Sequence, residues 1–235
     1  MSGKAVSLLH VTKRDAEGHL LLDDVSFDVE PGGHVALVGQ VGSGKTLVLR
    51  LIAGAEQLDE GAVIVDGVSV AALGYRELQA HRASTGFAFE LAGLLANQTI
   101  FENVALPLRY HEGGRLGEEE IRARVSGLLE ELHVAPATAA LLPARVNASV
   151  RKRALLCRAL VLEPRLLLFD EPQAALVTAE QRLVQEACDS RRKSRGMTII
   201  QADHDGHFGP FVPDRVVFLE RGRVKGIGAP GTLTA

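Results

Sequence analysis

The sequence predicts an α/β fold built on a mainly parallel β-sheet, and three observations carry this prediction. Strand-like and helical patterns alternate along much of the chain, which is typical of parallel α/β sheets. A short apolar run, HVALVG, leads directly into the glycine-rich stretch QVGSGKT and an apolar helical segment. A second apolar run, RLLLFDE, ends in two adjacent acids, at the sheet edge where α/β folds bind ligands.

The N-terminal part of the chain is predicted to consist mainly of strands. Residues 5–12 and 20–30 alternate in the manner of strands and are followed by a PGG turn. Residues 34–39 have the β-rich apolar composition of a buried parallel strand. Residues 62–70, with an Asp-Gly turn signal, predict a further strand.

The middle of the chain is predicted to be helical from about Glu118 to Arg158, as a lobe inserted into the sheet. The segments that follow predict a strand at 165–171, a helix at 178–194, a strand at 197–205 and a closing hairpin at 215–228. No internal repeat, low-complexity segment or flexible linker is evident. We therefore expect residues 1–235 to form one domain.

Composition and charge narrow the functional classes. The chain has 235 residues, of which 46% are hydrophobic, enough for a substantial core. Its net charge is −3, which gives no electrostatic reason to expect a nucleic-acid or anionic-membrane partner. Cys157 and Cys188 are expected to be reduced thiols of a cytoplasmic protein. No signal-peptide core and no apolar run near the length of about 20 residues that spans a bilayer are present.

The sharpest motif is a full match to GxxxxGK[ST]. It comprises Gly39, Gln40, Val41, Gly42, Ser43, Gly44, Lys45 and Thr46. Glycines allow successive backbone N–H groups to wrap phosphates, and the following helix directs its N-terminus at them. Lys45 would reach the β- and γ-phosphates, and Thr46 would offer its hydroxyl to Mg²⁺. A structural glycine turn is the alternative, which the flanking strand and helix disfavour.

Asp170, Glu171 and His204 are the other candidate site residues. Asp170 would belong to the Mg²⁺ shell, and Glu171 would orient or deprotonate an attacking water. A solvated strand end that carries acids is the alternative. His204 would contact the γ-phosphate as a neutral imidazole, although a single histidine after a strand often has a structural role. His204 and His207 also have a loose metal spacing, but no third ligand is evident.

Together these motifs resemble the nucleotide-binding subunits of ABC transporters across essentially the whole chain. The family order is kept: phosphate loop, LDEGAVIVDG, a loop at GFAFE, a helical lobe, RLLLFDEP and the DHD histidine. The resemblance implies a P-loop NTPase fold of the ABC type, with an N-terminal antiparallel β subdomain and a helical subdomain inserted at roughly 90–162. Two stretches, Thr99 to His111 and 141–172, look most like the ATPases of Mla/Mce-type lipid transporters.

The resemblance also implies ligands, partners and a location. ATP and Mg²⁺ are the expected ligands. The expected partners are a second ABC ATPase subunit, in a homo- or heterodimer, and transmembrane permease subunits. The protein is expected in the cytoplasm, peripheral on the cytoplasmic face of the inner membrane. In such head-to-tail dimers, each ATP lies between the phosphate loop of one subunit and an LSGGQ or LSGGM signature of the other.

The signature position reads VNASV at 146–150 and keeps no residue of the family pattern. Ala148 and Ser149 add side-chain atoms where the family has glycines. Asn147 is expected to cap the next helix and is able to donate through its amide. Loss of one pre-organised donor costs about 10²–10³ in rate. A site that uses this segment is therefore expected to hydrolyse ATP poorly.

Three further positions depart from the family pattern. Glu90 stands where a Gln normally touches both Mg²⁺ and the membrane subunit, so we treat it as a candidate site residue with added negative charge. Leu176-Val177 replaces the usual Leu-Asp. The aromatic ring that usually stacks on adenine is missing, with Asp15 near its place and His19 the nearest ring.

These departures leave three readings open. The groups that a subunit applies to its own ATP are kept, whereas those lent to the partner's ATP are lost, which favours one ATPase of an asymmetric pair. A nucleotide-gated regulatory or structural module with little hydrolysis is the second reading. A homodimeric transporter ATPase with a divergent signature is the third.

Overall fold

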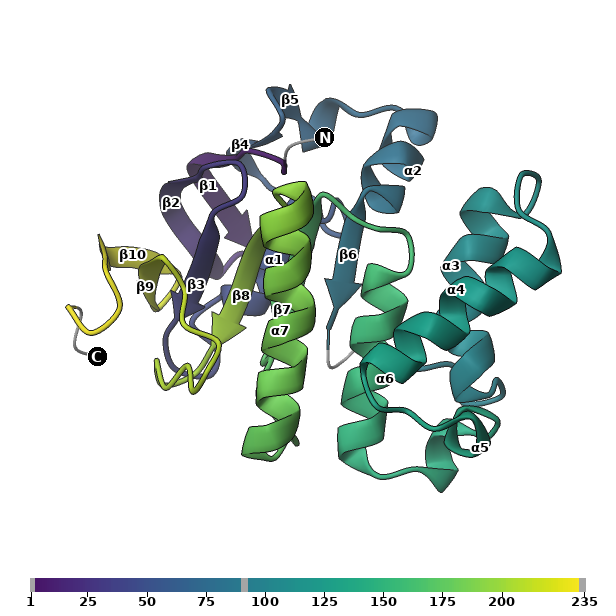
Figure 1. Cartoon of the computed structure of the whole chain (residues 1–235). Helices are drawn as coiled ribbons and strands as arrows, with labels where there is room; N and C mark the ends of the chain where they lie inside the picture. The colour runs from purple at the N-terminus through teal and green to yellow at the C-terminus, as the bar shows by residue number, and fades with distance from the viewer. Residues whose placement is uncertain (1–2, 90–92, 233–235) are drawn as a thin grey trace.

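The chain is described here from a computed structural model, which defines residues 3–89 and 93–232 (Figure 1). The strands are β1 (Val6–Arg14), β2 (Leu20–Val29), β3 (His34–Val38), β4 (Glu60–Val65), β5 (Val68–Ser69), β6 (Thr85–Ala88), β7 (Leu166–Asp170), β8 (Thr198–Asp203), β9 (Arg215–Glu220) and β10 (Arg223–Gly228). The helices are α1 (Lys45–Ile52), α2 (Tyr75–Ala83), α3 (Ile100–Glu112), α4 (Glu118–Glu131), α5 (Pro136–Ala139), α6 (Ala148–Leu160) and α7 (Thr178–Arg195), with 3₁₀ turns at Val70–Ala72 and Pro143–Arg145.

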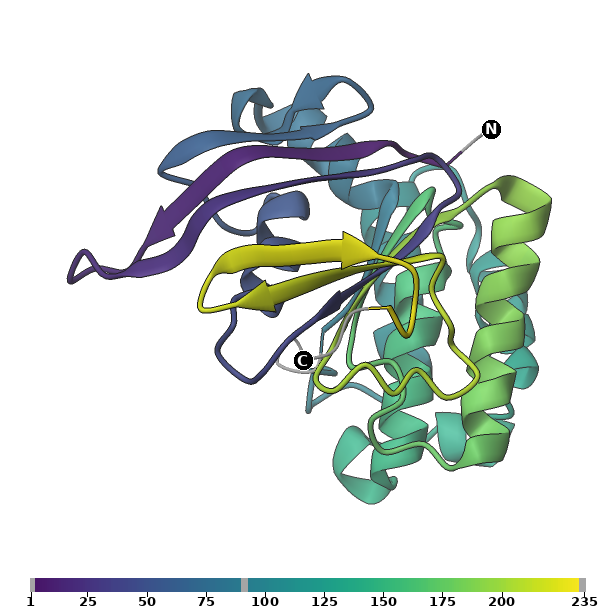
Figure 2. The same cartoon turned by 90° about the vertical axis from the view of Figure 1, so that its left-hand side faces the viewer.

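These strands form two sheets. The N-terminal sheet has the order β2-β1-β4-β5 and is antiparallel. The larger sheet has the order β10-β9-β3-β8-β7-β6; its strands are parallel except β10, which pairs antiparallel with β9. Figure 2 shows the long β1–β2 ribbon beside the β9–β10 hairpin. The predicted fold class, with an antiparallel N-terminal sheet and a mainly parallel core, is confirmed.

The central strands of the larger sheet are covered on both faces. Every residue of β3, β7 and β8 is buried, as expected for continuous apolar runs inside an α/β fold. Along β7, Leu166 and Leu168 pack in the cluster that contains α1 and the N-terminal sheet. Leu167 and Phe169 pack in the cluster that contains α6 and α7. The twofold alternation of the strand thus fixes which helices cover which face.

A helical lobe comprising α3–α6 lies between β6 and β7 in the chain and to one side of the sheet in Figure 1. Helix α3 begins at a capping box, in which Glu102 N donates to Thr99 Oγ1 and Thr99 N donates to Glu102 Oε2. Buried residues at helical spacing, Ile100, Val104 and Leu108, pack into the α6–α7 cluster. The lobe is therefore joined to the sheet through a shared core.

Two expected elements differ from the structure. The helical pattern at Glu118 to Arg158 forms three separate helices, because prolines start α5 and the 3₁₀ turn, and His133 adopts a left-handed backbone with φ 52°. The stretch GFAFE, expected as a loop, is partly strand: Thr85–Ala88 forms β6, parallel to β7. Cross-strand pairing with β7 decided this conformation, and a single segment does not reveal such pairing.

Candidate functional site

The phosphate-loop motif lies between β3 and α1, as predicted. Gly44 caps α1 with φ 101°, in the left-handed region that favours glycine. A Cβ at Gly39 would lie 2.0 Å from the carbonyl oxygen of Leu219 on β9. Both positions therefore require glycine. The loop ends at the N-terminus of α1, where backbone N–H groups and the helix dipole favour an anion.

Lys45 is buried at the first position of α1, with 5% of its surface exposed. Its Nζ donates to the carbonyl oxygens of Gly39 at 2.5 Å and Gln40 at 2.9 Å. Burial lowers the pKa of Lys45, while Glu171, Asp170 and Asp203 oppose that shift. The ammonium group of Lys45 is thus held within the phosphate loop by hydrogen bonds to the loop's own carbonyl oxygens.

Asp170 connects the end of β7 to the phosphate loop. Thr46 Oγ1 donates to Asp170 Oδ2 at 2.9 Å, and Asp170 is 6% exposed. The two predicted Mg²⁺ ligands are therefore adjacent although they are far apart in sequence. Hydroxyl and carboxylate oxygens are the ligands that Mg²⁺ prefers, so the donor set fits this ion.

Glu171 follows in an unusual backbone conformation with φ 51°, and its N–H donates to Ala202 O on β8 at 3.0 Å. Burial, together with the negative charges of Asp203 and Asp170, raises the pKa of Glu171 to about 7. Its Oε1 is buried and lies 3.2 Å from His204 Nε2, without hydrogen-bond geometry to any described residue. A carboxylate with this pKa is suited to accept a proton near neutral pH.

Two residues of this site were missed by the sequence reasoning. Asp203 ends β8 beside Val38 of β3, is 6% exposed, and has a pKa raised by burial. Lys152 of α6 donates to Asp170 O at 2.8 Å and lies over the ring of Phe169. The signal for Asp203 was an acid at the end of a buried strand, as for Asp170. Lys152 had no distinguishing signal, because it stands between Arg151 and Arg153 in α6.

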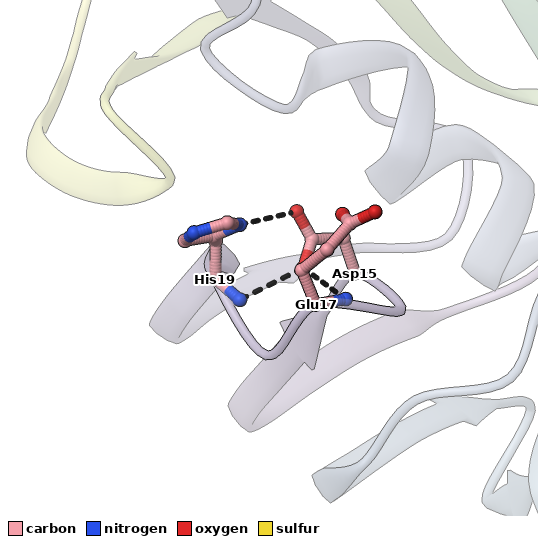
Figure 3. Close-up of side chains that lie close together, drawn as sticks. All are labelled: Asp15, Glu17 and His19. Atoms are coloured by element: carbon pink, nitrogen blue, oxygen red, sulfur yellow. Dashed lines mark hydrogen bonds and ion pairs between the residues drawn. The ribbon is translucent and has the colours of Figure 1, made fainter.

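A cavity of about 640 Å³ opens beside the phosphate loop, and its lining includes Lys45, Thr46, His204 and the β1–β2 turn. Figure 3 shows that turn: Asp15 accepts hydrogen bonds from the backbone N–H groups of Glu17 and His19, and its Oδ2 lies 3.0 Å from His19 Nδ1. The Asp15 carboxylate therefore shapes the turn. Of the described residues that line the cavity, none is a Phe, Tyr or Trp, and His19 is not one of them.

The 146–150 segment forms the entry to α6. Val146 is buried, and Asn147 caps the helix by accepting from Val150 N at 2.9 Å, so the expected cap is confirmed. Ala148 is exposed, and Ser149 Oγ donates to Glu180 Oε1 at 2.5 Å. The Ser149 hydroxyl is thus directed toward α7 of its own chain.

The structure therefore brings Lys45, Thr46, Asp170 and Glu171 together at one sheet edge, with His204 alongside. Val41, at the tip of the loop, is 83% exposed. His207 pairs instead with Asp205 at 3.3 Å, which does not support a metal pair with His204. Glu90 lies outside the described residues.

None of the helices in the described ranges combines the length and apolar character needed to cross a bilayer.

The family model described as ABC transporter matches residues 22–174. Two relatives are sulfate/thiosulfate import ATP-binding proteins. The one from Burkholderia mallei is 39% identical, and the match covers 89% of this chain and 58% of the relative. The one from Pseudomonas aeruginosa is 35% identical, and the match covers 89% of this chain and 62% of the relative. The chain thus spans about three-fifths of the length of these relatives.

Among solved structures, the ATP-binding cassette MJ0796, a dimer in a post-hydrolysis state bound to ADP and Pi, superposes with a TM-score of 0.89 at 27% identity. The superposition covers 97% of this chain and all of that one. The family match covers well over half of the chain and agrees with the phosphate loop, acidic strand end and helical lobe described above. The chain belongs to the ABC transporter family of ATP-binding proteins.

Proposed function

We propose that this chain is the ATP-binding subunit of an ABC transporter and that Gly39 to Thr46 hold the phosphates of ATP. The observation that carries the proposal is the juxtaposition of Thr46 and Asp170, whose side chains are 2.9 Å apart beside buried Lys45. Lys45 would exchange its bonds to Gly39 O and Gln40 O for phosphate oxygens, which are stronger acceptors when charged.

Thr46 and Asp170 are the residues that would hold Mg²⁺. When bound, this ion neutralises developing charge on phosphate oxygens. The chain itself contributes two oxygen donors that are already in contact. In addition, Lys152 Nζ donates a hydrogen bond to the carbonyl oxygen of Asp170 and so fixes the backbone of that residue. This pre-positioning lowers the conformational entropy lost on assembling the site.

For hydrolysis, we assign Glu171 the role of general base toward a water molecule and His204 the role of a γ-phosphate contact. Above about pH 7 the Glu171 carboxylate is mainly ionised and can accept the proton of the attacking water. His204 Nε2, 3.2 Å from Glu171, is close enough to orient the carboxylate as well.

The second ATPase subunit is proposed to supply a signature that the 146–150 segment does not. We favour an asymmetric pair, in which a partner with an intact signature completes the site on Lys45 and Glu171. The opposite site, which would use Asn147 and its neighbours, would bind ATP but turn it over slowly. The homodimer with a divergent signature is the alternative within the same function.

The permease subunits are proposed to dock beside Phe89, the residue that follows β6, on the cytoplasmic face of the inner membrane. A cavity of about 510 Å³ lies there, lined by Phe87 of β6 and Phe89 just after it, by Pro107 and Tyr110 of α3, and by Arg158 of α6. The cavity lies at the junction between the larger sheet and the helical lobe. A permease segment bound there could move the lobe relative to the sheet.

The transported solute has to be proposed on other grounds, because specificity for the solute lies in the membrane subunits and not in the ATPase. The relatives reported above are named for sulfate and thiosulfate import, so we propose an oxyanion importer first. The phospholipid expectation rests only on two short stretches of sequence and gains no support from these relatives. Permease subunits co-purified from native membranes, assayed in vesicles with labelled sulfate or phospholipid, would decide between them.

The regulatory-module reading is favoured by one observation: Ser149 is bonded to its own α7 rather than free for a partner's nucleotide.

The deciding measurement is the Mg-ATPase rate of the purified protein, with Lys45→Ala as the blank. A robust rate that both Lys45→Ala and Glu171→Gln abolish would support a homodimeric ATPase. A blank-level rate with ATP binding retained would require addition of the partner ATPase. If mixing gives no more activity than the partner alone, the module reading stands.

A further inference from the structure

Glu180, the third residue of α7, contacts two separate segments that precede it in the chain. Its Oε1 accepts a hydrogen bond from Ser149 Oγ at 2.5 Å, in the first turn of α6. Its Oε2 accepts from Val177 N at 3.1 Å, at the end of the loop that follows Glu171. One carboxylate therefore joins the 146–150 segment to the loop of the candidate base.

Arg153 of α6 extends this network to the end of α4, within the helical lobe. Its Nη2 lies 3.2 Å from Glu180 Oε1, and its Nη1 donates to the carbonyl oxygens of Leu132 at 2.8 Å and His133 at 2.9 Å. Those carbonyls belong to the two residues that directly follow α4. Arg153 is 7% exposed, and charge-assisted contacts in such surroundings are stronger than those at the surface.

A second capping-box glutamate in the chain provides a comparison. Glu102, at the same position of α3, accepts hydrogen bonds from Thr99, three residues before it, and from no other residue in the described ranges. Glu180 makes the equivalent local bond to Val177 but also binds residues 27 and 31 positions away. Helix capping alone requires only the local bond, so the remote contacts of Glu180 need another explanation.

We propose that Glu180 is a positioning residue that couples the helical lobe to the loop at 171–177. A shift of α4 or of the α6 entry would be transmitted through Arg153 and Ser149 to Glu180, and from there to the backbone that follows Glu171. The coupling itself is a property of the folded chain. Its effect on turnover rests on the ATPase function proposed above.

Hydrogen–deuterium exchange of the nucleotide-free protein tests the coupling. Ser149→Ala removes a single remote contact and keeps the Val177 cap, and Glu180→Gln removes the ion pair with Arg153. Loss of a hydrogen bond to a charged group corresponds to about tenfold in a local opening equilibrium. We expect amides of residues 171–178 to exchange about tenfold faster in both variants. Glu102→Gln, the matched control, should leave them unchanged.

Exchange at 171–178 that equals wild type in both Ser149→Ala and Glu180→Gln would overturn the proposal. Ser149→Ala is the safeguard against misfolding, because it truncates a half-buried hydroxyl only. Turnover is then measured with the completing partner: Glu180→Gln should lower kcat several-fold with the KM for ATP unchanged, while Glu102→Gln alters neither. Faster exchange combined with no ATPase activity even in wild type would retain the coupling and refute the proposed function instead.

Discussion

The hydroxyl of Thr46 donates to Asp170 Oδ2 at 2.9 Å, although 124 positions separate the two residues. The bond exists because β3 and β7 both flank β8 and end at the same edge of the sheet. The phosphate loop that leaves β3 then turns into α1 directly over the acid that ends β7. Topology alone thus assembles the pair of oxygen donors expected to hold Mg²⁺.

The first prediction concerns this pair. Thr46→Val keeps the shape of the side chain but removes the hydroxyl donor. We therefore expect the gain in ATP affinity on adding Mg²⁺ to be smaller than in wild type by a factor of at least about ten. Titration calorimetry with ATP, with and without Mg²⁺, measures the difference. Stability should fall by about 1 kcal/mol because the buried carboxylate loses this donor. Thr232→Val, which removes an exposed hydroxyl bonded to Ala229 O, is the control; an equal Mg²⁺ effect in Thr46→Val would contradict the assignment.

The second prediction concerns the pH dependence of turnover. Because the pKa of Glu171 is raised to about 7 and a general base must be ionised, activity should rise from pH 6 to pH 8 with a midpoint near 7. Glu171→Gln should lower the rate by at least about 10² at pH 8. Glu220→Gln, on the surface of β9, should retain the wild-type profile. A flat wild-type profile between pH 6 and 8 would exclude Glu171 as the base.

The same shift predicts a third effect, on stability. A carboxyl group whose folded-state pKa is raised holds its proton more tightly when folded, so the unfolded chain releases it first as pH increases. Folding stability is therefore lost as pH rises from the ordinary glutamate range through about 7. Glu171→Gln should consequently be more stable than wild type at pH 8, by about 1 kcal/mol after allowance for solvent screening, and equally stable at pH 4. Thermal unfolding at both pH values checks this, and a difference that is independent of pH would contradict it.

A fourth prediction concerns the N-terminus of α7. Val177 occupies the cap position with an exposed side chain and no side-chain hydrogen bond. Aspartate there would accept from the first free N–H groups of the helix, so Val177→Asp should stabilise the chain by about 1 kcal/mol. Val212→Asp, at another exposed valine outside helices and strands, serves as the control and should give no gain. An unchanged melting temperature in Val177→Asp would mean that Glu180 already satisfies this helix end.

Local sequence patterns predicted the parts of the site that depend on spacing within one segment. Gly39 to Thr46 and the Asp170–Glu171 pair lie as expected because a glycine turn before a helix and acids after a buried strand are local signals. The patterns did not reveal Asp203 or Lys152, whose importance depends on strand order and on the packing of α6 against β7. They also gave no indication of the Ser149–Glu180 bond, because a contact across 31 positions has no periodic signature.

The last prediction concerns Asn147 and the role of the 146–150 segment. Asparagine and aspartate cap helices about equally well, so Asn147→Asp preserves α6 while replacing the amide, which can donate to a phosphate, with a negative charge. If a partner's ATP meets this helix end, Mg-ATP-dependent association should weaken at least about tenfold. The melting temperature should stay equal or rise, because the charge also complements the helix dipole.

Sedimentation velocity in a Glu171→Gln background, where hydrolysis is blocked, measures the association. Asn147→Ala is the matched control: it removes the cap, which should cost about 1 kcal/mol of stability, but it introduces no charge and should weaken association less than Asn147→Asp does. The two variants thus separate helix stability from phosphate contact. Asn147→Ala should lower stability more than Asn147→Asp does, whereas Asn147→Asp should weaken association more than Asn147→Ala does. Association that is equal in Asn147→Asp and its parent would mean that no nucleotide approaches Asn147, and the regulatory-module reading would then be preferred to either dimeric ATPase.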